Sequence, residues 1–179
     1  MSDHDATGPS PFSDFDRLPA PSDAPNHAVH GGSLLGPGLI ERFDAYGNRA
    51  LVRRLQSGQM NEPPKEESLG EVVFFDCQVG SRLTSHAGVV HGGVISLLFD
   101  EACGWGYEGA IGEKIPAVTG NLVVDFRQPL RAGERFRIRV YHTRTEGRKV
   151  ALRASLESVS GGVVYADATC LYIMLRSRL

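Results

Sequence analysis

The stretch VHGGVISLLFDEACGWG, residues 90–106, constrains the fold more than any other part of this chain. Its length and spacing predict one long helix. Apolar side chains cover most of the circumference of that helix, and they are Val94, Ile95, Leu97, Leu98, Phe99, Ala102, Cys103 and Trp105. A helix that is apolar nearly all round is buried. We therefore expect a central helix that is enclosed by a sheet.

Other segments have the patterns of the strands that would form this sheet. They lie at residues 71–80, 117–129, 134–145, 150–159 and 163–175. The third of them alternates arginines with apolar residues, which is typical of a strand with one wet and one dry face. Short turns such as EGRK and SGG make consecutive strands antiparallel neighbours. The prediction is an α+β domain in which a curved antiparallel sheet of about five to six strands wraps the long helix.

The N-terminal part of the chain differs in composition from this domain. Residues 1–37 hold six of the ten prolines, together with many Ser, Gly and Asp residues. Such a segment buries too little apolar surface to offset its ordering entropy, so we expect a mostly disordered acidic arm. Apolar residues near helical spacing predict a helix within 38–57, followed by a linker. The expected division is therefore an arm at 1–37, a helix and linker at 38–67, and the main domain at 68–179.

Composition also limits the location of the protein. No stretch approaches the ~18 apolar residues of a membrane helix, and the acidic N-terminus lacks the apolar core of a secretory signal. Cys77, Cys103 and Cys170 are widely spaced, odd in number and form no metal-binding pattern. We expect reduced thiols, no bound metal, no membrane partner and a cytoplasmic location.

The tetrapeptide VHGG occurs twice, at 29–32 and 90–93. In the second copy Gly92 and Gly93 begin the predicted helix, where free N–H groups and the helix dipole polarise a substrate carbonyl. Asp100 is a carboxylate on the otherwise apolar helix, and it is either a salt-bridged rim residue or the group that hydrolysis requires. The first copy precedes glycines and a proline that break a helix, so we interpret it as chance.

The spacing between Gly92 and Asp100 has a geometric consequence. Eight residues of helix correspond to about 12 Å along the axis. Asp100 therefore does not easily reach a carbonyl held at the start of its own helix. If both residues act on one carbonyl, the glycine comes from one subunit and Asp100 from another, in a two-fold symmetric homodimer with two sites.

Several motifs together resemble those of the hotdog-fold acyl-CoA thioesterases, in the phenylacetate-type branch. They are HGG at 91–93 followed by Asp100, then PAVT at 116–119 and RQP at 127–129. EGRK at 146–149 and the ending VVYADATCLYIML are most similar to the mammalian member-four type of the thioesterase superfamily. The resemblance covers residues 69–176. It implies a hotdog fold, a homodimer or dimer of dimers, an acyl-CoA substrate and no cofactor other than the CoA of that substrate.

The resemblance also implies roles for individual residues. Asp100 is the base or nucleophile, and the N–H of Gly92 polarises the thioester carbonyl. His91 fixes the loop and the thioester, and Thr119, from the same subunit as Asp100, positions the water or the carboxylate. Several relatives have an Asn six residues before the HGG histidine, where this chain has Ser85.

That departure leaves the carbonyl contact open between Ser85, the following His86, and Gly92 with a water. The implied CoA phosphates lie on the turn that carries Arg148 and Lys149. Trp105 is interpreted either as core or as a wall of the acyl tunnel. The expected substrate-binding residues are therefore Ser85, His86, Gly93, Arg148, Lys149 and Trp105.

The charge distribution is uneven although the net charge is only −2. Residues 127–153 hold nine basic residues against two glutamates. Two interpretations stay open, namely a solvated sheet face and a surface for an anionic ligand that carries phosphates. The basic residues are not interleaved with exposed aromatic residues, and the protein is slightly acidic, which argues against nucleic acid as a partner.

Two other functions compete with thioester hydrolysis. One is a hotdog hydratase or dehydratase, but the sequence offers no second His–Asp or His–Glu pair for proton shuttling. The other is a non-catalytic acyl-CoA-binding protein or sensor, which the substitution at Ser85 leaves open. The sequence favours hydrolysis of an acyl-CoA to the free acid and CoA.

Overall fold

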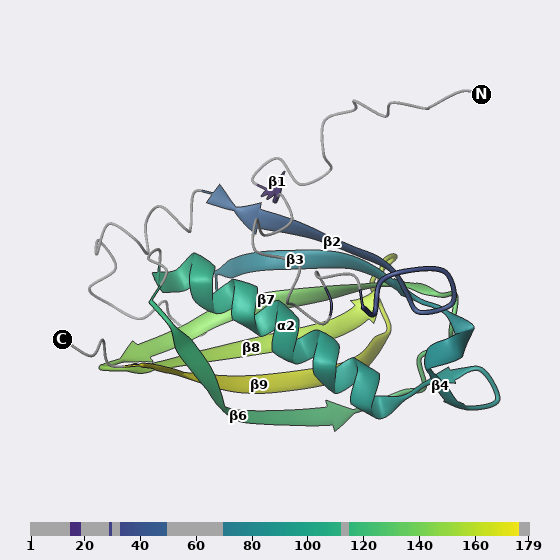
Figure 1. Ribbon diagram of the computed structural model, residues 1–179. Coiled ribbons are helices and arrows are strands. Elements are labelled where there is room, and N and C mark those ends of the chain that lie inside the picture. The colour runs from purple at the N-terminus through teal and green to yellow at the C-terminus, as the bar shows by residue number, and fades with distance from the viewer. Residues whose placement is uncertain (1–14, 19–28, 30–32, 50–69, 112–114, 176–179) are drawn as a thin grey trace.

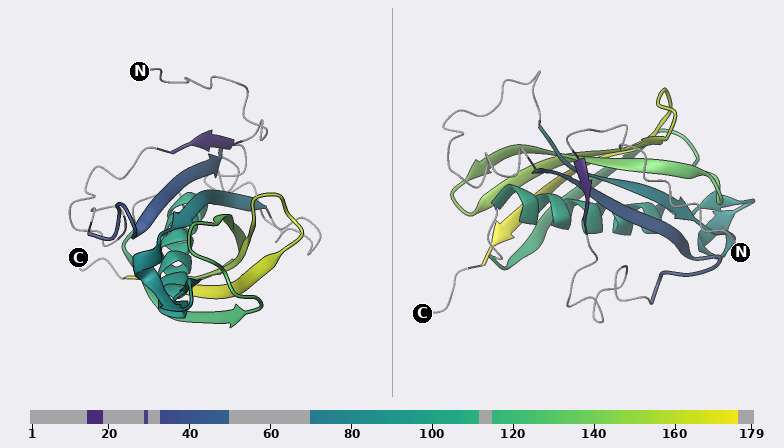
Figure 2. Two further views of the ribbon diagram at one scale, coloured as in Figure 1. Left: turned by 90° about the vertical axis from the view of Figure 1, so that its right-hand side faces the viewer. Right: turned by 90° about the horizontal axis from the view of Figure 1, so that it is seen from above.

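One long helix lies across the concave face of a curved sheet in the computed structural model (Figure 1). The structure describes residues 15–18, 29, 33–49, 70–111 and 115–175. The helix is α2, Gly92–Ile111. A view along the molecule shows the strands curving around α2 (Figure 2). The predicted α+β arrangement of a central helix wrapped by an antiparallel sheet is confirmed.

The sheet has seven strands among the described residues, in the order β1-β2-β3-β7-β8-β9-β6, and every neighbouring pair is antiparallel. The strands are β1 (Phe15–Arg17), β2 (Ile40–Asn48), β3 (Glu71–Val79), β6 (Ala117–Phe126), β7 (Arg135–Glu146), β8 (Lys149–Ser158) and β9 (Val164–Met174). A short 3-10 helix, Ser81–Leu83, leads into a separate hairpin of β4 (Thr84–His86) and β5 (Val89–Val90). The expected five to six strands are exceeded because β1 and β2 come from the N-terminal part of the chain.

The helix predicted within 38–57 is wrong for residues 40–48, which form strand β2 beside β3. Both faces of this strand pack against aromatic residues. Phe43 stacks on Phe75 at 4.5 Å between ring centroids, and Tyr46 stacks on Phe74 at 4.8 Å. Phe43 and Tyr46 are three residues apart and lie on opposite faces of the strand. Because both positions are aromatic, their spacing resembles that of one face of a helix. Residues 50–57 lie outside the described part of the chain.

The disordered arm predicted at 1–37 is also wrong in part. Strand β1 pairs with β2, and Val29 is fully buried within the hydrophobic core. Composition averaged over the segment concealed these few anchoring residues. Of the first VHGG copy, Val29 therefore has a packing role, whereas His30 and its two glycines lie outside the described residues.

Deletion of residues 1–37 is expected to lower the melting temperature by about 4–8 °C. Loss of one buried Val side chain lowers the free energy of unfolding by about 2 kcal/mol. For a domain of this size, each kcal/mol lost lowers the melting temperature by ~2–4 °C. Calorimetry of the truncated and full chains measures the shift. Equal melting temperatures would mean that the arm contributes nothing to folding.

Two glycines inside α2 face strands of the sheet, and the helix continues past both of them to Ile111. A Cβ at Gly106 would lie 2.6 Å from Val140 Cγ1 of β7, and a Cβ at Gly104 would lie 3.4 Å from the Tyr172 hydroxyl of β9. Gly106 thus removes a side chain where β7 approaches the helix backbone, whereas the distance at Gly104 is an ordinary van der Waals contact.

Within the described ranges, α2 falls short of the apolar character that a membrane-spanning helix needs.

Candidate active site

Strand β6 forms one edge of the sheet and carries side chains to both halves of α2. Its alternation is interrupted once. Thr119 pairs with Tyr172 and Asn121 pairs with Leu171, so Gly120 is the extra residue of a β-bulge. The bulge places Thr119 on the same face as Leu122. The two residues are three positions apart, so strict alternation would have placed them on opposite faces. A Cβ at Gly120 would lie 2.8 Å from Ile173 Cγ1, which favours glycine there.

The Asp100 carboxylate is held by hydroxyl groups from the sheet. Thr119 Oγ1 donates a hydrogen bond to Asp100 Oδ1 at 2.8 Å. The Tyr172 hydroxyl donates to the Asp100 backbone oxygen at 2.8 Å and lies 3.4 Å from Oδ1. Among the described residues no hydrogen-bond partner is recorded for Oδ2. This half-buried carboxylate therefore has one oxygen fixed and one open.

His91 caps the start of α2 and leaves one backbone donor open. Its Nδ1 accepts the Gly93 N–H at 2.9 Å, and its carbonyl accepts the N–H of Ile95 at 3.2 Å. For the Gly92 N–H no acceptor is recorded within the described ranges. The positive end of the helix dipole adds to this donor. Gly92 is thus the free N–H that sequence analysis assigned to a carbonyl, whereas the N–H of Gly93 is already satisfied.

A groove of about 330 Å³ opens beside the Gly92 end of α2. Its lining residues are Ser85, Val89, Val90, Gly92, Ile95, Phe126, Arg127, Gln128, Pro129 and Leu130. The groove therefore brings Ser85 to the same surface as Gly92. His86 does not line it. The Phe126 ring lies against Gly92, because a Cβ there would be 3.3 Å from Phe126 Cζ.

The two predicted halves of the site lie apart within one chain. Asp100 contacts Thr119 near the start of β6, whereas Gly92 lies beside Phe126 at its end. The eight residues between Gly92 and Asp100 span about 12 Å of helix. The seven residues from Thr119 to Phe126 span about 23 Å of extended strand. One chain therefore does not bring the open oxygen and the free N–H to one thioester.

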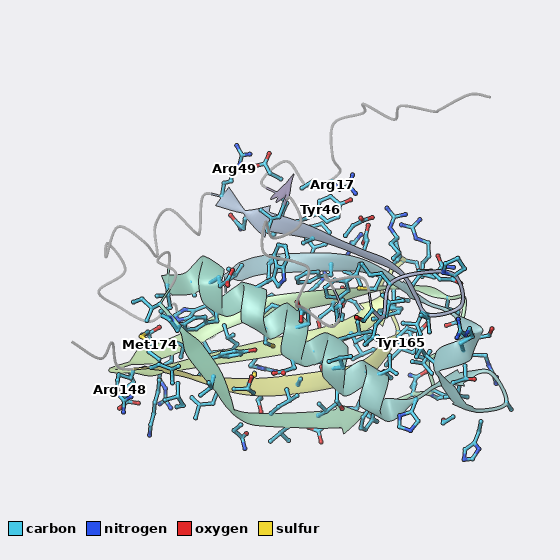
Figure 3. All side chains as sticks on the ribbon, viewed as in Figure 1. Arg17, Tyr46, Arg49, Arg148, Tyr165 and Met174 are labelled. Carbon is cyan, nitrogen blue, oxygen red and sulfur yellow. The ribbon has the colours of Figure 1, made fainter. Side chains whose placement is uncertain are left out.

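The basic turn lies at the Asp100 end of the sheet. Gly147 and Arg148 connect β7 to β8, with Gly147 at φ 56°. Arg148 Nη1 donates to the Met174 carbonyl at 3.0 Å, and both residues lie at the same end of the sheet (Figure 3). Met174 pairs with Ala117, two residues from Thr119. No ion pair is recorded for Arg148 or Lys149 among the residues that the structure describes.

The arginines of β7 serve the sheet instead. Arg137 pairs with Asp76 at 2.9 Å and its guanidinium lies 4.7 Å from the centre of the Phe74 ring. Arg139 pairs with Glu71 at 2.8 Å and also with Glu157. Their carboxylate partners come from β3 and β8, so this part of the basic run is neutralised. The predicted dry face is confirmed, because Phe136, Ile138 and Val140 are fully buried. The predicted wet face is wrong for Arg137, which is buried against Asp76 and the Phe74 ring.

Trp105 is not brought to Asp100. Its ring packs edge-on against Phe75 of β3 at 5.8 Å between centroids. Asp100 contacts Thr119 of β6 and Tyr172 of β9. In the strand order of the sheet, β7 and β8 separate these two strands from β3. The core interpretation of Trp105 thus has a contact in the structure, and the acyl-tunnel interpretation stays a prediction.

Tyr172 is the residue that sequence analysis missed. Tyr172 continues the row of buried residues Ala166, Ala168 and Cys170, which alternate along β9. A polar hydroxyl at the end of a buried row needs a hydrogen-bond partner, and this was the signal available in the sequence. Burial and the charge of Asp100 raise the pKa of Tyr172, so it is protonated and donates at neutral pH. The sequence could not show that its hydroxyl meets Asp100.

Cysteine chemistry does not contribute to this site. A hydrogen bond with the Cys170 thiol and burial raise the pKa of Cys103 well above its usual range, and burial does the same for Cys77. Buried, protonated thiols are poor nucleophiles. All three cysteines are free and buried. Among the described residues, no three His, Cys, Asp or Glu side chains are grouped to hold a metal ion.

The chain is similar to several known proteins. The model of the thioesterase superfamily matches residues 87–173, which include α2 and the strands that surround Asp100. Residues 87–173 are therefore similar to members of the thioesterase superfamily. Acyl-coenzyme A thioesterase THEM4 of Bos taurus is 32% identical to the chain over 153 residues, which are 79% of this chain and 58% of that protein. The Mus musculus protein of the same name is 31% identical over 98 residues, 55% of this chain and 41% of that protein. The chain spans about half the length of these curated relatives.

Solved structures of other proteins share the fold. A mutant of phenylacetic acid degradation protein PaaI from Thermus thermophilus aligns with a TM-score of 0.51 at 24% identity, over 61% of this chain and 96% of that chain. An acyl-CoA hydrolase from Staphylococcus aureus, solved in complex with butyryl coenzyme A, aligns with a TM-score of 0.53 at 17% identity, over 58% of this chain and 63% of that chain. The expected hotdog fold is confirmed.

Proposed function

We propose that this chain hydrolyses acyl-CoA thioesters to the free acid and CoA. The hydrogen bond from Thr119 to Asp100 Oδ1 carries the proposal, because it fixes a half-buried carboxylate and leaves Oδ2 open to a water. The relatives named acyl-coenzyme A thioesterase support the same reaction. The free Gly92 N–H supplies the second group that acyl transfer needs, a donor for the carbonyl oxygen.

In the proposed reaction Asp100 acts as the general base. Its Oδ2 takes a proton from water as the water oxygen attacks the thioester carbon. The carbonyl oxygen becomes negative and accepts the Gly92 N–H, which the helix dipole strengthens. Collapse of this intermediate breaks the carbon–sulfur bond. The proton on Asp100 then passes to the leaving CoA sulfur, which restores the carboxylate.

We propose that two chains build each site, with Asp100 and Thr119 from one and Gly92 from its neighbour. Strand β6 supports a homodimer, because it is an unpaired edge within the described sheet. Its exposed apolar side chains are Val118, Val123 and Phe126, whose exposed fractions are 49%, 48% and 54%. Edge strands of this kind are usually covered in native proteins. Two antiparallel copies of α2 at a two-fold axis would form two equal sites. A dimer of dimers remains part of the proposal.

We further propose that Arg148 and Lys149 bind the CoA phosphates. The turn that carries these two residues lies at the end of the sheet where β6 begins, near Thr119 and Asp100. The β7 arginines Arg137 and Arg139 are less suited to bind phosphates, because they already form ion pairs with carboxylates of the sheet. Ser85 is proposed to contact the thioester from the groove that it shares with Gly92. The reaction is proposed to need no cofactor. The free thiols support a reducing, cytoplasmic location.

A panel of acyl-CoA esters, from acetyl to palmitoyl and including phenylacetyl, tests the proposed reaction. Release of free CoA thiol is measured in the presence of a chelator, and calorimetry measures binding of the same esters. The expected result is steady-state turnover of at least one ester with the chelator present. Binding without turnover across the panel would contradict hydrolysis and would indicate an acyl-CoA-binding protein.

A further inference from the structure

The hydroxyl of Tyr172 reaches the backbone of α2 at the turn that carries Asp100. It donates to the Asp100 carbonyl at 2.8 Å, and it lies beside Gly104, where a Cβ would be in ordinary van der Waals contact with the hydroxyl oxygen at 3.4 Å. The glycine costs the helix about 1 kcal/mol relative to alanine. The Tyr172 hydroxyl thus approaches the helix backbone at a point where residue 104 carries no side chain.

The Tyr172 ring is itself held in place. Only 7% of the residue is exposed, and its ring stacks on that of Tyr107 with centroids 5.3 Å apart and planes 20° apart. The Tyr107 hydroxyl is bonded elsewhere, because it donates to the Ile115 carbonyl at 2.8 Å, so the stacking does not depend on it. The hydroxyl of Tyr172 therefore presents one fixed donor to the helix.

Sheet register links Tyr172 to Thr119. The two residues are direct partners across β9 and β6, so one cross-strand pair supplies both hydroxyls that reach Asp100. Thr119 holds the carboxylate, and Tyr172 holds the helix turn beneath it. Together they fix the side chain and the backbone of the same residue against the same two strands.

We infer that Tyr172 is a positioning residue that sets the place of the Asp100 carboxylate for thioester hydrolysis. This inference rests on the proposed function. Tyr172 acts through Asp100 and touches no substrate atom. Because a misplacement of about 1 Å can cost ~10²-fold in rate, its loss should affect turnover more than binding.

Tyr172→Phe keeps the ring and removes the hydroxyl, and Tyr107→Phe makes the same change one ring away with no contact to Asp100. Both variants lose one buried hydrogen bond, so similar losses of stability, about 1 kcal/mol each, are expected. We expect kcat of Tyr172→Phe to fall about ten-fold or more with KM within about two-fold. Tyr107→Phe should keep kcat within about two-fold of the unaltered protein. A normal kcat for Tyr172→Phe, or equal losses in both variants, would overturn the inference.

Crystal structures of the two variants separate this inference from the proposed function. We expect the Asp100 Oδ1–Thr119 Oγ1 distance to lengthen beyond hydrogen-bond range in Tyr172→Phe alone. If the unaltered protein hydrolyses no ester in the panel, the proposed function fails, and the carboxylate position still decides the role of Tyr172. An unmoved carboxylate in Tyr172→Phe would overturn that role.

Discussion

Asp100→Asn is expected to lower kcat by about 10²–10⁴ while binding of acyl-CoA is retained. The amide has nearly the shape of the carboxylate, so Thr119 still has an oxygen to which it can donate at the observed position. The amide nitrogen cannot accept a proton from water. The chemical step therefore loses its base, whereas the contacts to CoA stay in place.

The matched control for this variant is Glu101→Gln, which removes the next carboxylate along the chain. Initial rates with the best ester of the panel give kcat and KM, and calorimetry gives binding to each variant. Glu101→Gln is expected to retain activity within about two-fold. Full activity in Asp100→Asn, or a matching loss in Glu101→Gln, would remove Asp100 from the role of the base.

Gly92→Pro is expected to lower kcat by about 10²–10³, the usual cost of removing one donor from an oxyanion hole. Proline lacks the N–H that is left free at the start of α2, yet it is well tolerated as the first residue of a helix. The substitution therefore removes the proposed donor with little cost to the helix.

Gly92→Ala is the control, because it adds a Cβ and keeps the N–H. That Cβ would lie 3.3 Å from the Phe126 ring, which must shift slightly, so a small loss of rate is expected. Rates for both variants are compared at saturating acyl-CoA, after circular dichroism has shown that both are folded. Equal losses in the proline and alanine variants would mean that steric crowding, and not the N–H, limits the reaction.

The central helix and most of the sheet could be predicted because their patterns are local. An apolar helix of 20 residues needs a sheet around it, and the alternation in β7 reports its buried face directly. Strand β2 was mistaken for a helix because Phe43 and Tyr46 pack on opposite faces of the sheet. That packing depends on β3 and on β1, which lie elsewhere in the sequence.

The candidate site was predictable only where a motif marks it. Asp100, Gly92 and Thr119 followed from the motif, and the structure places Thr119 on Asp100. Tyr172 was not predictable, because its contact depends on the pairing of β9 with β6 and on the bulge at Gly120. A count of basic residues likewise could not show that Arg137 pairs with Asp76, which lies 61 residues earlier in the chain.

The central claim is that two chains complete each site, and mixing two inactive variants tests it most directly. Asp100→Asn and Gly92→Pro are first shown to be folded dimers by size-exclusion chromatography, then mixed in equal amounts and allowed to exchange subunits. A heterodimer would hold one doubly altered site and one intact site, with Gly92 from one chain and Asp100 from the other.

Random exchange makes about half of the dimers heterodimers, each with one of its two sites intact. Thiol release by the mixture is therefore predicted to rise from near zero to about a quarter of that of the unaltered protein. Heterodimers that are isolated by two different affinity tags should release thiol at about half the rate of the unaltered protein. Proven heterodimers that stay as inactive as either parent would show that Gly92 and Asp100 act within one chain, which contradicts the shared site.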